Sequence, residues 1–245
     1  MRRPVMPEFL TFALAAPLAA MGDIAVGERR GSWDRPGRSA ILGLIAACLG
    51  LVREDEAAHA ALETGYGVAL RRQGLGSLLA DYHTAQVPSR QRGRRFATRA
   101  EELRAGSLET ILSRRDYRAE VLVLAALWAR SGARWPLTEI EVALNAPHYA
   151  QYFGRKSCPL MLPLAARRQQ AADPAAALAR RAVDGPEPER QTFRLSQSAV
   201  ITMSAADAHE FGLQIQRVEV RRDAVVSRRR WQFGLREDAV LAAVM

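Results

Sequence analysis

Cysteine is scarce in this chain. Among its 245 residues only Cys48 and Cys158 are cysteines, and neither has a histidine or second cysteine at the spacing of metal ligands. The sequence therefore excludes a disulfide framework and predicts no structural zinc site. Cys48 lies in an apolar stretch, where a small buried thiol is usual. Both cysteines suit a reducing compartment, so we expect a cytoplasmic protein.

Long apolar runs are missing as well. No stretch reaches the roughly 18 to 20 apolar residues that a membrane span needs, although the hydrophobic content of 49% supports a real core. The N-terminus imitates a secretory signal peptide, because Arg2 and Arg3 precede an apolar stretch at 9–20. Glu8 interrupts the approach and Pro17 breaks the stretch, so we interpret it as part of the folded protein.

Positive charge is in excess and is concentrated. The net charge is +9 and the sequence pI is near 10.6. Segment 90–115 holds eight arginines against three glutamates and segment 217–236 holds seven against two acidic residues, so each nets +5 and the remainder nets −1. Localised charge of this kind is typical of a polyanion footprint. It favours nucleic acid over a membrane, because no long amphipathic basic helix is evident.

One run near the middle of the chain combines the groups that hold an anion. Residues 152–160 begin with two aromatics and continue with Gly154, Arg155, Lys156 and Ser157 before a proline. The glycine permits close backbone approach, the two cations neutralise phosphate, and the hydroxyl offers a short hydrogen bond. A basic surface turn after a helix is the alternative interpretation.

Two further groups add to this hypothesis. Arg38, with the helix start at Ser39, is a candidate for a second anion site. Tyr152 or Phe153 is a candidate to stack on a splayed base, although burial in the core is an equal alternative for each.

The element pattern predicts an α+β fold. The order of strand, helix, strand, strand, helix, strand suggests a ferredoxin-like sandwich in 1–184, and a Pro-rich linker at 185–189 precedes a small β-rich C-terminal extension at 190–245. We expect strands at Phe9–Ala15, Gly67–Arg72, Ser77–Thr84, Asp116–Trp128 and around Val218, Val225 and Trp231, and helices from Ser39 to about Leu49 (capped by Ser39), at Glu56–Glu63, at Leu137–Asn145 (capped by Thr138) and at Pro174–Arg181.

An insertion at about 87–113 interrupts this pattern. It is rich in Arg, Gly and Ser and too long for an ordinary connection. Its arginines Arg90, Arg92, Arg94 and Arg95 lie close together, so we expect a basic segment that is mobile in isolation and orders on RNA or on a neighbouring subunit.

Several of these stretches resemble, in the same order, the CasD family of CRISPR-associated proteins. The resemblance rests on the apolar run 38–51, the acidic turn at 54–55, the motif at 81–84, the central run 152–160 and the tripeptide 172–174, and it covers about Phe9 to Arg181. It implies a ferredoxin-like RNA-binding fold whose insertion is a protruding thumb hairpin.

The resemblance also implies a function. Members of the CasD family are subunits of type I-E Cascade complexes, and within the complex this subunit holds the five-prime handle of the CRISPR RNA. Its partners are that single-stranded handle, the backbone subunits and the large target-recognition subunit. The family's first loop ends in tryptophan and glycine, whereas Met21 stands here in the tryptophan place. The implied stacking role of that loop therefore does not carry over.

Catalysis is the alternative. A related family in type I-C systems cuts its precursor RNA without metal, which needs a base, an acid and a cation. The candidates are Tyr82, His83 and Lys156, the last being the only lysine in the chain, with His148 and Tyr149 as further titratable groups. This inventory is thin, and no Gly-rich nucleotide loop or Ser-His-Asp pattern stands out. The sequence therefore predicts no metal, no cofactor and binding rather than cleavage.

Overall fold

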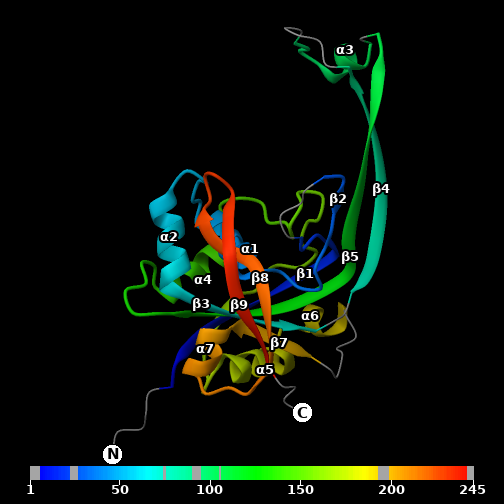
Figure 1. Ribbon diagram of the computed structural model, residues 1–245. Helices are drawn as coiled ribbons and strands as arrows, with labels where there is room; N and C mark the ends of the chain where they lie inside the picture. The colour runs from blue at the N-terminus through cyan, green and yellow to red at the C-terminus, as the bar shows by residue number, and fades with distance from the viewer. Residues whose placement is uncertain are drawn as a thin grey trace, which may run out of the picture.

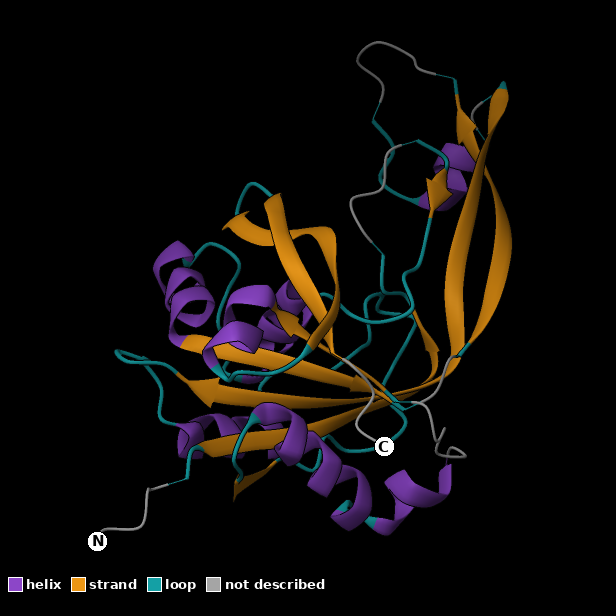
Figure 2. Ribbon diagram, turned by 60° about the horizontal axis from the view of Figure 1, so that its bottom comes forward, coloured by secondary structure: helices purple, strands orange, loops and turns teal. Residues whose placement is uncertain are grey.

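The computed structural model describes residues 6–22, 27–73, 76–89, 95–104, 106–192 and 199–241. In this part of the chain the strands form a single sheet in the order β6-β1-β5-β3-β7-β9-β8, and β2 and β4 pair with β5 outside that path. Helices cover both faces of the sheet (Figures 1 and 2). The elements are β1 (Glu8–Ala19), β2 (Arg29–Arg30), α1 (Arg38–Cys48), α2 (Glu56–Gly65), β3 (Tyr66–Arg72), β4 (Ser77–Pro88), α3 (Arg99–Leu103), β5 (Leu108–Ala129), α4 (Leu137–Asn145), β6 (Arg167–Gln170), α5 (Pro174–Asp184), α6 (Glu187–Thr192), β7 (Val200–Ser204), α7 (Ala205–Glu210), β8 (Ile215–Ser227) and β9 (Gln232–Leu241).

Strand β1 and the inner half of β5 are buried on both sides. On β1, Phe12 and Leu14 pack with α1, α2 and α4, whereas Phe9 and Ala13 pack with α5 and α7 on the opposite face. Successive side chains of a strand point to opposite faces, so a strand between two helical layers is apolar almost throughout. This confirms the predicted strand at Phe9–Ala15, which the structure extends past Pro17 to Ala19.

The predicted helices are confirmed, but two predicted caps are wrong. The N-cap of α1 is Gly37 and that of α4 is Pro136, so Ser39 and Thr138 lie inside the first turn and make no cap hydrogen bond. The cap of α2 is Asp55, whose carboxylate accepts a bond from the helix backbone at 2.9 Å. None of the helices in the described ranges is long and apolar enough to cross a membrane.

The C-terminal part continues the main sheet. Strand β7 pairs with β3, and β9 and β8 follow it outward. The Pro-rich stretch 185–189 is not a loose linker, because α6 starts within it and buried Glu189 forms an ion pair with buried Arg181. Strand β8 includes the predicted positions Val218 and Val225. Trp231 instead lies in the turn before β9, with a φ of 56°.

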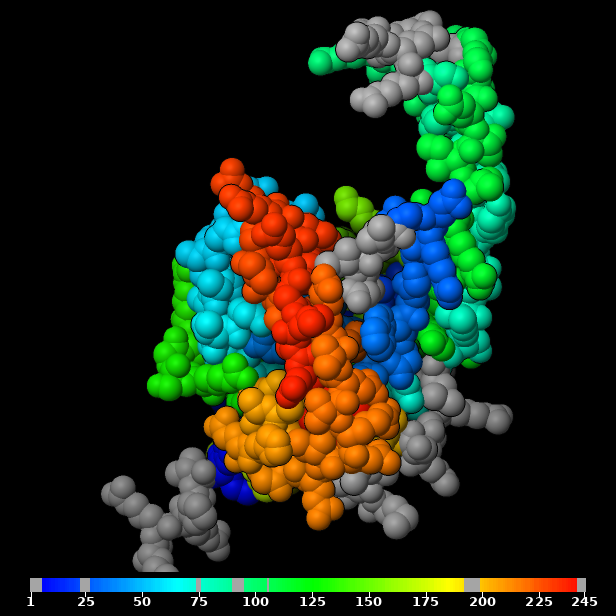
Figure 3. All heavy atoms as spheres, viewed as in Figure 1, coloured from blue at the N-terminus to red at the C-terminus, as the bar shows by residue number. Residues whose placement is uncertain are grey.

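A long two-stranded arm projects from the body. Strands β4 and β5 pair from Ser77 and Ala119 out to Pro88 and Leu108, and α3 lies near the tip (Figure 1). The outer part of the arm stands clear of the body (Figure 3), whereas β2 pairs with β5 nearer its root. The predicted insertion at 87–113 corresponds to its outer part, and the hairpin already begins at Ser77.

Candidate nucleic-acid interface

A groove of about 670 Å³ opens beside α1. One face of that helix forms its floor with small side chains, Ala40, Gly43 and Ala47, which follow the three- and four-residue spacing of a helical surface. Tyr152 and Gly154 of the central run lie at one side, and the turn between β8 and β9 lies at another. Small floor residues keep the groove open beside Ala40 and Ala47, whereas the Arg228 guanidinium lies over Gly43.

The lining of the groove is cationic and aromatic. Among the described residues, five arginines and one aspartate line it, together with four aromatic side chains. A positive groove with exposed rings is the arrangement that tracks a single-stranded nucleic acid. The charged and aromatic lining residues are Arg30, Arg53, Arg221, Arg222, Arg228, Asp223, Trp33, Tyr152, Trp231 and Phe233.

The central run is locked to the end of β1. The backbone NH of Phe153 donates to the Cys158 carbonyl at 2.7 Å, and the Phe153 carbonyl accepts from the NH of Ala20 at 3.0 Å. Gly154 has a φ of 90°, and a Cβ at this position would overlap the carbonyl oxygen of Ala20. Glycine is therefore required here both by conformation and by space.

The two aromatics that begin this run are separated by the fold. Phe153 is buried in the core beneath α1, so it is unavailable for stacking. Tyr152 is 42% exposed and lines the groove. The sequence left burial and stacking as alternatives for both residues. The structure shows burial for Phe153, and Tyr152 stays a candidate for stacking.

The two cations of the run differ in their surroundings. Arg155 lies over the Tyr117 ring at 4.4 Å, and its guanidinium donates to the Asp116 and Arg30 carbonyls at 3.3 Å. Lys156 is exposed and makes no hydrogen bond or ion pair with the described residues, and Ser157 beside it is exposed as well. Lys156 is thus positioned for a ligand, whereas Arg155 also fastens the run to β5.

Arg38 is occupied by the protein itself. It is buried, forms an ion pair with Glu63, and donates to the Glu63 and Tyr66 carbonyls. It therefore ties α1 to the end of α2 and does not face a ligand. Ser39 lines the groove, but its carbonyl accepts from the Arg228 guanidinium. Met21, in the family's tryptophan place, is buried in the core.

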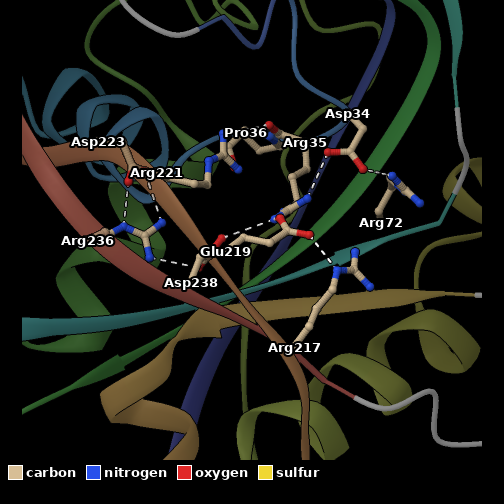
Figure 4. Close-up of polar contacts among 10 residues, drawn as sticks. All are labelled: Asp34, Arg35, Pro36, Arg72, Arg217, Glu219, Arg221, Asp223, Arg236 and Asp238. Carbon is tan, nitrogen blue, oxygen red and sulfur yellow. Dashed lines mark hydrogen bonds and ion pairs between the residues drawn. The ribbon is translucent and has the colours of Figure 1, made fainter.

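Buried ion pairs join the β8–β9 hairpin to the body through Arg35 and link its two strands to each other through Arg236 (Figure 4). Arg35, just before α1, pairs with Glu219 on β8 and lies 3.6 Å from Asp238 on β9. Arg236 pairs with Asp223 at 2.7 Å and with Asp238 at 2.8 Å. We call this set the hairpin latch.

Other arginines of segment 217–236, which the sequence assigned to a ligand, are also bound within the protein. Arg221 is buried, lies over the Trp33 ring at 4.7 Å and donates to the Arg35 and Pro36 carbonyls, and Arg217 pairs with Glu219. The interpretation of segment 217–236 as one polyanion footprint is therefore wrong in large part. Its exposed arginines are Arg217, which pairs with Glu219, and Arg222, Arg229 and Arg230.

Sequence reasoning missed Trp231 as part of the candidate site. It lies in the turn and is 53% exposed, with the Arg53 guanidinium 4.8 Å and the Arg228 guanidinium 5.8 Å from its ring. Its edge meets Phe233 at 5.3 Å. The signal was three consecutive arginines before two closely spaced aromatics, a basic and aromatic mixture that the β-strand interpretation of this stretch obscured.

His59 lines the same groove but does not supply a positive charge for a phosphate. Burial, together with the nearby Arg228 charge, lowers the pKa of His59 even though its ring contacts the Val52 carbonyl at 3.1 Å. The imidazole is therefore neutral at neutral pH. Burial likewise raises the pKa of Cys48 to about 12, which removes it as a nucleophile.

The alternative catalytic residues do not converge. Tyr82 and His83 are neighbours on β4, so their side chains point to opposite faces of the arm. The His83 ring lies next to the Asp81 carboxylate, and among the described residues no hydrogen bond or ion pair joins Tyr82 or His83 to Lys156. No cluster of three or more metal-ligating side chains occurs among the residues that the structure describes.

Only one of the four insertion arginines that the sequence assigned to RNA binding lies within the described residues. Arg90, Arg92 and Arg94 lie outside the described residues. Arg95 is exposed near the arm tip. Close to the arm's root, buried Asp116 accepts from Arg29 at 3.3 Å and from Arg114 at 3.4 Å.

Comparisons with known proteins agree with one another. A solved structure described as a CRISPR RNA-guided surveillance complex superposes with a TM-score of 0.62 at 19% identity, covering 95% of this chain and 89% of that one. Another, described as a crystal structure of a Cas protein, gives a TM-score of 0.57 at 18% identity over 95% and 94%. At these identities the likeness shows the fold: a mixed α/β protein with a large antiparallel sheet.

The sequence relationships are more specific. The CRISPR system Cascade subunit CasD of Escherichia coli (strain K12) is 34% identical over 181 residues, which are 71% of this chain and 76% of that protein. The family model described as CRISPR-associated protein (Cas_Cas5) matches residues 9–237. The match spans both the core sheet and the β8–β9 hairpin. The chain therefore belongs to the CasD family of CRISPR-associated proteins.

Proposed function

We propose that this chain is the subunit of a type I-E Cascade complex that binds the five-prime handle of the CRISPR RNA and does not cut it. The single observation that carries the proposal is the groove beside α1, whose lining includes the exposed cations Arg30, Arg53 and Arg222 and the exposed rings of Tyr152 and Trp231. Family membership supports the same function, because the E. coli relative is a Cascade subunit.

The ligand fits the chemistry of the groove. Single-stranded RNA offers unstacked bases for rings such as Tyr152 and phosphates for cations such as Lys156 and Arg222. Gly154 and Ser157 present backbone and hydroxyl beside Lys156. A duplex, in contrast, has no splayed bases to place against the rings.

The fold also supports RNA binding of this family type. The core strands lie in the order β6-β1-β5-β3, with α1 and α4 packed on one face. Numbered along the chain, that is 4-1-3-2, the arrangement of a ferredoxin-like βαββαβ unit. We propose that this unit spans 1–184 and that the C-terminal strands are an extension of its sheet.

The arm is proposed as the contact to neighbouring subunits and to RNA. Large apolar side chains are exposed on both of its faces and on α3, and exposed apolar groups of this kind mark interaction surfaces. These residues are Leu78, Leu79, Tyr82, Leu103, Ile111 and Leu112. The basic tip around Arg95 supplies charge for the RNA.

Cleavage remains the second candidate, because Tyr82, His83 and Lys156 are all exposed to some degree. Their failure to converge supports binding without cleavage. One experiment separates the two: repeat-derived RNA is incubated with the purified protein and a chelator, then resolved on native and denaturing gels. We expect a shift without a cut.

A matched pair of variants sharpens this test. Lys156→Ala should weaken RNA binding while leaving the melting temperature unchanged, since exposed substitutions usually shift stability by within about 0.5 kcal/mol. Arg155→Ala should weaken binding and also lower stability, because Arg155 fastens the central run. A discrete cut product that disappears on changing His83 or Tyr82 would move the assignment to an endoribonuclease.

A further inference from the structure

The indole of Trp231 is exposed at one wall of the groove, on a turn whose position is fixed. Trp231 is 53% exposed, and its backbone has a φ of 56°. Bulky residues rarely adopt this left-handed conformation, which carries a local conformational cost. The turn therefore keeps a large apolar ring at the surface by an unfavourable backbone geometry.

The turn that carries Trp231 is fixed to the helical layer. The Glu56 carboxylate, at the start of α2, accepts from the Ser227 hydroxyl at 2.7 Å and from the Arg229 NH at 2.9 Å. The Ser227 hydroxyl in turn accepts from the Arg230 NH at 3.1 Å. The hydrogen bonds from the Ser227 hydroxyl and the Arg229 NH lower the pKa of Glu56. Trp231 is thus pre-positioned.

Two guanidinium groups flank the ring and differ in freedom. Arg228 is buried and bound to the Ser39 carbonyl, and its guanidinium lies against Gly43, where an added Cβ would come within 3.3 Å of it. Arg53 comes from the exposed connection between α1 and α2 and lies 4.8 Å from the ring centre. The first cation is fixed, whereas the second is able to move aside or to cover a ligand.

We infer that Trp231, with Arg53 and Arg228, forms a stacking site for one unpaired base of single-stranded RNA. The site rests on the proposed RNA-binding function and extends it to the C-terminal hairpin. An aromatic plane stacks on any base, and a guanidinium plane stacks on it as well or neutralises the adjacent phosphate. Flanking cations favour a base over an apolar protein side chain, which would gain nothing from them.

The test uses a short oligouridylate RNA that carries one fluorescent 2-aminopurine, placed at each position in turn. With the wild-type protein we expect quenching at one position, where the analogue stacks. Trp231→Ala should abolish that quenching and weaken binding by about 5- to 100-fold, as one lost base–aromatic stack implies. Trp231→Phe should retain most of both signals.

The controls separate this site from the function on which it rests. Val220→Ala removes an apolar side chain that is 60% exposed on the same hairpin but outside the groove, and should change neither signal. Melting curves verify that each variant is folded. A matching oligodeoxyuridylate with 2′-deoxy-2-aminopurine tests whether the site instead binds a base of single-stranded DNA.

The outcomes are distinct. If folded Trp231→Ala binds and quenches like the wild type, the stacking site is wrong and the RNA-binding function stands. If the wild-type protein binds no RNA, the function and the site fail together. If quenching occurs with the DNA probe and not with the RNA probe, the site belongs to another strand and the inference is overturned.

Discussion

The two long hairpins of this molecule come from similarly basic stretches of sequence, but one is exposed and the other is packed on the body. The β4–β5 arm leaves the body and exposes both of its faces, whereas the β8–β9 hairpin is bound to the body by the hairpin latch (Figures 1 and 4). Both come from segments with a net charge of +5. In the second hairpin the charge is mainly internal structure, and only part of it faces a ligand.

The difference has a functional consequence. A hairpin held by buried charges presents a fixed wall, and the groove between it and α1 is formed before any ligand arrives. A two-stranded ribbon without a packed face is marginally stable in water. The arm therefore suits a contact that orders on assembly, and the groove suits a preformed RNA site.

The largest expected effect comes from breaking the latch. Asp238→Ala would remove a buried carboxylate that faces both Arg35 and Arg236, although Glu219 and Asp223 stay beside them, and removing one partner from such a buried set costs about 3 kcal/mol. The neighbouring exposed Glu237→Ala is the matched control and should cost less than about 0.5 kcal/mol. Chemical denaturation measures both. Equal losses would mean that the hairpin is not latched.

Two left-handed glycines give the next effect. Gly154→Ala in the groove should cost about 2 kcal/mol, because the new Cβ meets the Ala20 carbonyl as well as a φ of 90°. Gly106→Ala near the arm tip has a φ of 40° and no atom within 4 Å of the new Cβ, so only the conformational cost of about 1 kcal/mol applies. Thermal unfolding compares them. A larger loss at Gly106 would reverse our view of the arm as loosely packed.

The smallest effect is on the salt dependence of RNA binding. Arg90, Arg92, Arg94 and Arg95 changed together to Gln should flatten the fall of log affinity with log salt by about 0.7 for each phosphate no longer neutralised. The core should stay folded, and assembly with the backbone subunits should be impaired. Changing Arg217 to Gln is the contrasting control, because its partner is Glu219. An unaltered slope and unaltered assembly would reduce the arm to a solvated insertion.

Much of the fold followed from periodicity alone. The strand at Phe9–Ala15, the helices at Glu56 and Pro174 and the long strand at Asp116–Trp128 were predictable, because burial on one or both faces leaves a repeating apolar pattern. The caps were not, since a serine or threonine one position inside a helix looks the same in sequence as one at its start. The latch was hidden for a similar reason, because charge counts do not show which carboxylate each arginine meets.

The candidate site was predictable only where local geometry carried it. Gly154 and Lys156 stood out because glycine and an isolated lysine have few roles in such a run. Arg38 looked like a ligand for an anion, but its partner Glu63 is distant in sequence and became visible only in the fold. Trp231 lines the groove because its turn is bonded to Glu56, a partner distant in sequence that the local basic and aromatic pattern does not reveal.

Hydrogen exchange with and without repeat-derived RNA tests the central claim most directly. Without RNA, backbone amides of the latched hairpin should exchange slowly and those of the outer arm should exchange fast. Adding RNA should protect the central run 152–160 and the turn at 227–231, with no RNA cut during the experiment. Protection confined to the arm, or cleavage of the RNA, would contradict a preformed RNA-binding groove in a non-catalytic subunit.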